Sequence, residues 1–129
     1  MSSNDPPKIR DTIKSDHLYI IASDPLPNGD VLVFNLTTSD WDSDKTCEVK
    51  VGDHPYVEHD SVVAYQYAET RTPRAIARLK MLASPVAYEP VSEKLFVRIL
   101  EGAIKSPDTA DYVKAIVREI LAKMAKSSS

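Results

Sequence analysis

The chain has 129 residues, of which 43% are hydrophobic, and its 16 Lys and Arg against 19 Asp and Glu give a net charge of −3. This is enough chain for one globular domain with an ordinary core, and so acidic a domain is not expected to bind duplex DNA. No apolar run is long enough for a membrane span or a secretion signal, and the single Cys47 fits a reducing compartment. We therefore predict a cytoplasmic protein without membrane contacts.

The ends of the chain are predicted to lie outside the domain. Residues 1–14 contain Pro6-Pro7, serines and mixed charge, which is typical of a flexible lead. We expect a single domain over residues 15–126 and a short tail over residues 127–129.

A β-rich block follows from residue 17 to residue 69. The apolar runs at 17–23 and 31–38, separated by DPLPNGD, predict an antiparallel hairpin. Both runs are apolar on both faces, which favours a small closed barrel covered on one side by helices or by a second subunit. Residues 46–51 alternate as a half-buried strand with Cys47, Val49 and Val51 inward, and residues 61–68 predict another strand.

The last part of the chain is predicted to be helical. Pro73 suits a helix start before the stripe at 75–82, Ser92 suits an N-cap, and Ser106-Pro107-Asp108 is expected to open the final helix. Strands followed by helices predict an α+β domain. The apolar stripes of these helices would cover the sheet or build a subunit interface, and the sequence leaves both open.

The β-rich block holds every histidine of the chain. His17 precedes the first strand, whereas His54 and His59 lie in GDHPYVEHDS beside carboxylates. Histidine transfers protons near neutral pH, so these residues are candidate general acids or bases. The alternative is that His54 and His59 make structural hydrogen bonds in a polar loop. The hydroxyls that end the second strand suit a phosphate or a turn, and they belong to Thr37, Thr38 and Ser39.

Motifs for a metal or a nucleotide cofactor are missing from the sequence. Zinc prefers cysteine and histidine ligands, which here would be Cys47, His54 and His59. The spacing of these residues does not match that of the usual paired zinc ligands. The chain has no Walker loop, G-x-G-x-x-G, G-x-S-x-G or H-E-x-x-H. We predict neither a metal nor a cofactor.

A basic stretch follows the acidic segment 40–69 and comprises Arg71, Arg74, Arg78 and Lys80. It could contact phosphates, because electrostatic attraction follows local charge, or it could be a solvated helix face.

Two segments resemble the MazF/PemK/Kid toxins. HLYIIASDPLPNGDVLVFNLTTS is similar to their opening hairpin, an R-P-x-V-V-x-S strand followed by a strand ending x-P-x-T-S, and SVVAYQYAETRTPRAIARL is similar to their later D-Q-x-R-T segment. The resemblance covers roughly residues 15–80. GDHPYVEHDS has no counterpart in those toxins, and it resembles a segment of a bacterial group to which no activity is attached.

The resemblance implies an SH3-like barrel that dimerises, binds an antitoxin protein and cuts single-stranded RNA without a metal. Thr38 falls on the family's active-site threonine, Ser39 on the serine after it, and Gln66 on the glutamine of D-Q. His17 replaces the family's active-site arginine, and Tyr65 replaces the aspartate. Histidine can carry a proton and a charge but lacks the forked donors of arginine.

We therefore expect a toxin-like endoribonuclease in which His17 is the acid or base and Thr38 a hydrogen-bond donor. Binding would involve Thr37, Ser39 and Gln66, with Arg71 or Arg74 on the RNA backbone, and His54 and His59 rank second as acids or bases. The alternative is a non-catalytic SH3-like module that holds a protein partner through its groove, Trp41 and the acidic loop.

Overall fold

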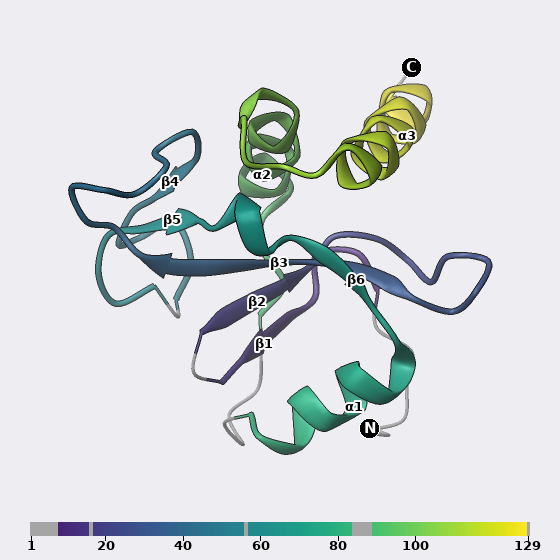
Figure 1. Ribbon diagram of the computed structural model, residues 1–129, viewed down its shortest axis with the longest axis horizontal. Helices are drawn as coiled ribbons and strands as arrows, with labels where there is room; N and C mark the ends of the chain where they lie inside the picture. Colours follow the sequence, from purple (N-terminus) through teal and green to yellow (C-terminus); the bar gives the residue numbers. More distant parts are fainter. Residues whose placement is uncertain (1–7, 16, 56, 84–88, 129) are drawn as a thin grey trace.

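Six short strands form one antiparallel sheet that lies between helices (Figure 1). The computed structural model describes residues 8–15, 17–55, 57–83 and 89–128. The elements in chain order are β1 (Thr12–Lys14), β2 (Leu18–Ile21), β3 (Val31–Thr38), β4 (Glu48–Val49), β5 (Ser61–Val63), the 3-10 turn η1 (Tyr65–Tyr67), β6 (Glu69–Arg71), α1 (Pro73–Met81), α2 (Glu93–Lys105) and α3 (Asp111–Ser128). The α+β class and the β2–β3 hairpin are confirmed.

The eight-residue strand β3 organises the sheet. Along one edge it pairs with β2, and along the other it pairs first with β6 and then, nearer its C-terminal end, with β5. The turn η1 joins β5 to β6, so both short strands lie beside β3. The strand order is β1-β2-β3-β5-β4, and no pairing among the described residues joins the outer strands β1 and β4. The sheet is therefore open, and the closed barrel that we predicted is not what the structure shows.

Helices on both faces explain why the strands are apolar on both faces. The even-numbered side chains of β2 and β3, such as Leu18 and Phe34, share a core with α2 and α3. The odd-numbered side chains, such as Ile21 and Val33, share a second core with Ile76 and Leu79 of α1. Figure 1 shows α1 on one side of the sheet and α2 and α3 on the other. Strands that are apolar on both faces are therefore found in a sheet between helical layers as well as in the closed barrel that we predict from them.

Several predicted boundaries need correction. Residues 12–14, assigned to the flexible lead, form β1, in which Ile13 is buried; residues 1–7 of that lead lie outside the described residues. The strand predicted at 46–51 contracts to β4, because the chain turns at Gly52 (φ +102°) and leaves Val51 exposed. The strand predicted at 61–68 is interrupted by η1. Helix α3 runs into the predicted tail.

The first two helices begin where the sequence predicts. The Thr72 hydroxyl accepts a hydrogen bond from the Ala75 amide next to Pro73, and the Ser92 hydroxyl accepts one from the Leu95 amide. Leu82 was expected on the buried side of α1, but it caps the helix and is exposed. None of the helices in the described part of the chain is long and apolar enough to cross a bilayer.

The third helix begins later than predicted, because Ser106 ends α2 instead of opening α3. Its buried hydroxyl donates to Asp44 Oδ2 at 2.6 Å and accepts from the Asp108 amide at 3.1 Å. These bonds tie the turn before α3, which starts at Asp111, to the loop that precedes β4. Burial would raise the pKa of Asp44, but hydrogen bonds from Ser106 and Thr46 together hold this pKa below its ordinary value.

We expect the variant Ser106→Ala to raise the pKa of Asp44, because burial would remain while the main opposing hydrogen bond is lost. Since the pKa is lowered in the folded protein, the carboxylate stabilises the fold above about pH 4, and that contribution disappears as the pH falls through the folded pKa. An NMR titration of the Asp44 carboxyl carbon measures the change. Ser127→Ala, which removes an exposed hydroxyl bonded to Lys123 O, is the control. An unchanged Asp44 pKa would contradict the assignment.

Candidate functional site

Two adjoining pockets lie on the sheet where α1 no longer covers it. The larger, which we call the tyrosine pocket, has a volume of about 630 Å³. Its lining includes Tyr19, Asn35, Gln66, Tyr67, Arg71 and Tyr112. The smaller, which we call the histidine pocket, has a volume of about 120 Å³, and its lining includes Lys14, His17, Thr38, Glu58 and His59. His17 and Thr37 line both pockets, so the two form one continuous site.

The register of the hairpin brings the pocket residues together. Tyr19 of β2 pairs with Asn35 of β3, and Leu18 pairs with Leu36, so continuing the ladder by one residue places His17 opposite Thr37. Odd-numbered residues of β3 share one face. On that face α1 covers Val31 and Val33. Asn35 and Thr37 lie beyond the core that packs against α1, and they line the tyrosine pocket.

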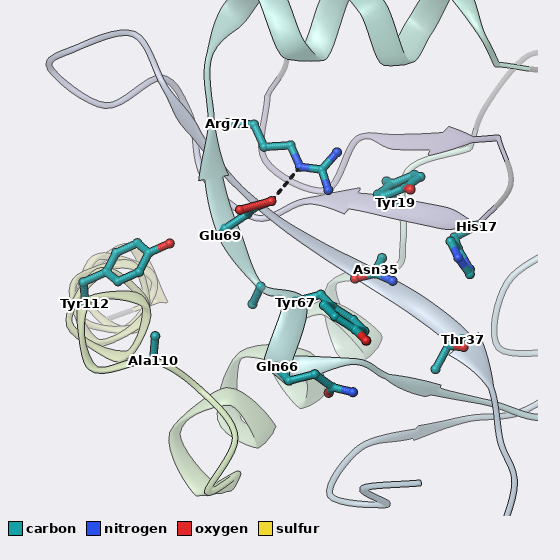
Figure 2. Close-up of a pocket in the computed structure, with 11 residues that line it drawn as sticks. His17, Tyr19, Asn35, Thr37, Gln66, Tyr67, Glu69, Arg71, Ala110 and Tyr112 are labelled. Atoms are coloured by element: carbon teal, nitrogen blue, oxygen red, sulfur yellow. Dashed lines mark ion pairs between the residues drawn. The ribbon is translucent and has the colours of Figure 1, made fainter.

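Arg71 is held in place by two neighbours. Its guanidinium lies 5.1 Å from the centre of the Tyr19 ring, and its Nε lies 3.6 Å from Glu69 Oε1 (Figure 2). Among the described residues the buried Nε has no hydrogen-bond partner. A guanidinium stacked on a ring and paired with a carboxylate has a fixed orientation. Arg71 therefore contributes a positioned charge to the pocket, partly balanced by Glu69.

The histidine pocket combines groups that can move protons with a cation. Thr38 Oγ1 lies 3.0 Å from His59 Nε2, a hydrogen bond between the end of β3 and the segment before β5. His17 directly precedes β2. Its ring lies edge-on to the Tyr19 ring, with 6.2 Å between the two ring centres. Lys14 at the end of β1 completes the group. Two imidazoles and an ammonium in one small pocket can act as an acid, a base and a source of positive charge.

The structure brings most of the predicted site residues to this site. His17, Thr38 and His59 line the histidine pocket, Gln66 and Arg71 line the tyrosine pocket, and Thr37 lines both.

The remaining predicted residues lie elsewhere. Ser39 lines neither pocket and donates its backbone amide to Asp60 O at 3.0 Å. Arg74 is exposed on α1, outside both linings. His54 is 4% exposed, and its Nε2 lies 2.8 Å from the Glu89 carbonyl oxygen. This hydrogen bond connects the segment after β4 to the segment before α2.

Sequence reasoning missed Lys14, Asn35, Tyr67 and Tyr112. The two-residue period of a strand could have identified Asn35, because it precedes Thr37 by two residues and so shares its face of the sheet. Lys14 was hidden by its assignment to the lead. Tyr112 comes from the start of α3, a helix remote in sequence, and no local pattern relates it to the sheet.

Cys47 belongs to the core instead of to the site. Its side chain is 5% exposed, packs in the core under α2, and burial raises the pKa of its thiol. Its inward orientation was predicted from the alternation of residues 46–51. Within the described ranges, no group of three or more His, Cys, Asp or Glu side chains could hold a metal ion.

Comparison with known proteins adds no relative. No protein-family model, curated protein or solved structure matches this chain.

Proposed function

We propose that the protein is a toxin-like, metal-independent endoribonuclease that cuts single-stranded RNA. The observation that carries the proposal is the histidine pocket, in which His17, His59 and Lys14 line one small hollow. RNA cleavage through its own 2′-hydroxyl needs a base, an acid and positive charge near the phosphate. The pocket offers side chains suited to each of these roles.

In the proposed reaction, one imidazole removes the proton of the 2′-hydroxyl, and the resulting oxygen attacks the adjacent phosphorus. The bond from phosphorus to the 5′-oxygen breaks, and the other imidazole, in its protonated form, donates a proton to that leaving oxygen. The products are a 2′,3′-cyclic phosphate and a 5′-hydroxyl. Lys14 stabilises the negative charge that develops on the phosphoryl oxygens. His17 and His59 are the acid–base pair, and Thr38 acts as a positioning residue through its hydrogen bond to His59.

The tyrosine pocket would extend the site along the RNA strand. Arg71 supplies a charge, and Gln66 supplies an exposed amide in the pocket that His17 also lines. A cation together with aromatic side chains is a common arrangement for binding single strands.

The wider proposal follows the toxin resemblance. The strands of the toxins' SH3-like barrel would correspond to β2, β3, β5 and β6, which here belong to an open sheet organised by β3. In this proposal the protein forms a homodimer in the cytoplasm and is neutralised by an antitoxin protein.

The proposal predicts that the purified protein cuts a single-stranded RNA in EDTA and leaves a 2′,3′-cyclic phosphate. Arg71→Ala should lower cleavage about tenfold through loss of a contact to the strand, whereas Arg78→Ala, an exposed residue of α1 outside both pockets, should not. Product ends are identified by mass spectrometry. Absence of cleavage, or cleavage that EDTA abolishes, would refute the proposal.

A second candidate is a non-catalytic module that binds a protein partner. It is favoured by Trp41, whose side chain is 91% exposed in the acidic loop between β3 and β4. Exposed tryptophan is enriched among residues that dominate protein interfaces. This candidate predicts that expression of the protein leaves cellular RNA intact, and that Trp41→Ala, unlike His17→Ala, abolishes partner capture.

A further inference from the structure

Two tyrosine rings that line the tyrosine pocket are exposed to solvent. Tyr67 is 64% exposed although it lines the pocket, and Tyr112 of α3 is 50% exposed. Figure 2 shows Tyr112 on the side opposite His17, with Tyr67 and Asn35 between them. Stacking on an aromatic side chain is how single-stranded nucleic acids bind their bases, and each stack changes affinity roughly 5- to 150-fold.

The floor of the pocket carries an amide without an internal partner. Asn35 is 8% exposed, and its backbone is fixed by the pairing with Tyr19 and by a 2.9 Å hydrogen bond from the Ala64 amide to its carbonyl oxygen. Among the described residues its side chain makes no hydrogen bond, and it faces the pocket. A ligand that fills the pocket would bury this amide, and a ligand that leaves its donor or acceptor unmatched would then bind more weakly.

The ion pair in the pocket leaves little net charge, which suits an uncharged base inside it and leaves Arg71 to contact the strand. Arg71 lies in the pocket beside Glu69, whose carboxylate opposes entry of a second anion. A volume of about 630 Å³ falls in the range of small-ligand pockets. His17 and Thr37 also line the histidine pocket, so a base in the larger pocket would be next to the phosphate in the smaller one.

We infer that the tyrosine pocket binds one unpaired nucleobase, with Tyr67 stacked on its face and Asn35 hydrogen-bonded to its edge. An amide offers one donor and one acceptor side by side, the pattern that pairs with adenine. Adenine also has a larger ring than uracil or cytosine and stacks more strongly on Tyr67, so the base bound is adenine in preference to these two pyrimidines. This inference rests on the proposed RNA substrate and names the base that the site selects.

The experiment measures binding without cleavage. Fluorescently labelled 2′-O-methyl oligonucleotides, which lack the attacking hydroxyl, are used as all-uridine strands or with one central adenosine or cytidine. We expect the adenosine strand to bind about tenfold more tightly than the all-uridine strand. Tyr67→Ala should weaken binding about tenfold, whereas Tyr67→Phe, which keeps the ring, should bind as the unchanged protein does.

The base preference is tested at Asn35. Asn35→Asp removes the amide donor that adenine N7 needs and should therefore reduce the preference for the adenosine strand. Equal affinity for all three strands, or a Tyr67→Ala variant that binds unchanged, would overturn the inference. Tyr67 is exposed, so its substitution tests the inference even where Asn35→Asp does not fold. Binding with these preferences but without cleavage of ordinary RNA would refute the nuclease and leave the base pocket standing.

Discussion

Replacing His17 with alanine is expected to lower the single-turnover rate of RNA cleavage by about 10² to 10⁴-fold, the contribution of a positioned acid or base. His59→Ala should cause a loss of similar size, because each imidazole has one of two proton transfers. The rate of the double variant should fall by much less than the product of the two single reductions, because the effects of groups that act as a unit are not additive. Binding of the uncleavable 2′-O-methyl RNA should change only a few-fold in either variant.

The pH dependence of the rate separates the two roles. An acid and a base acting together give a bell-shaped profile, and removal of either histidine should flatten one limb and keep the other. Thr38→Val should lower the rate by a smaller factor than either histidine variant, since it removes the hydroxyl that positions the His59 imidazole. Rates that stay within a few-fold in both histidine variants would show that the histidine pocket is not the catalytic centre.

Gly102→Ala is expected to destabilise the fold by about 3 kcal/mol, because the new methyl group has no room. A Cβ at Gly102 would lie 2.2 Å from the Tyr65 hydroxyl oxygen and 3.1 Å from Cys47 Cβ. Tyr65 is fully buried and donates to the Ile99 carbonyl oxygen at 2.7 Å. Either α2 shifts, or the hydroxyl moves and this hydrogen bond is lost.

Urea denaturation of four proteins measures this effect: the unchanged chain, Gly102→Ala, Tyr65→Phe and the double variant. Tyr65→Phe alone should cost about 1 kcal/mol or more, from loss of a buried hydrogen bond. The double variant should be more stable than the sum of the two losses predicts, because the phenylalanine leaves space for the methyl group. Strict additivity would show that the contact between residues 65 and 102 does not cause the destabilisation.

Local patterns were enough to predict the hairpin and the starts of the first two helices. The strands flanking DPLPNGD, the helix start at Pro73 and the cap at Ser92 depend on residues near one another in sequence, and there the prediction agrees with the structure. The open sheet depends on where α1 packs, which is a tertiary contact. An apolar run is the same in a closed barrel and in a sheet between helices, so the sequence could not distinguish them.

The site was predictable to the extent that it follows one strand. His17 and Thr37 are brought together by the hairpin register, and the histidines identified the region. The bond between Thr38 and His59 requires β5 to lie beside β3, and the position of Tyr112 requires α3 to fold back. Neither contact has a signal in local spacing.

The interruption between β5 and β6 makes the composition of the tyrosine pocket depend on chain length. Glu69 and Arg71 lie opposite Val33 and Val31, and this register is set by the residues from 64 to 68. Deleting or inserting one residue there would exchange the faces of β6 and direct Thr70 into the pocket in place of the ion pair. Related chains that differ by one residue in this turn would carry the same core and a different ligand selectivity.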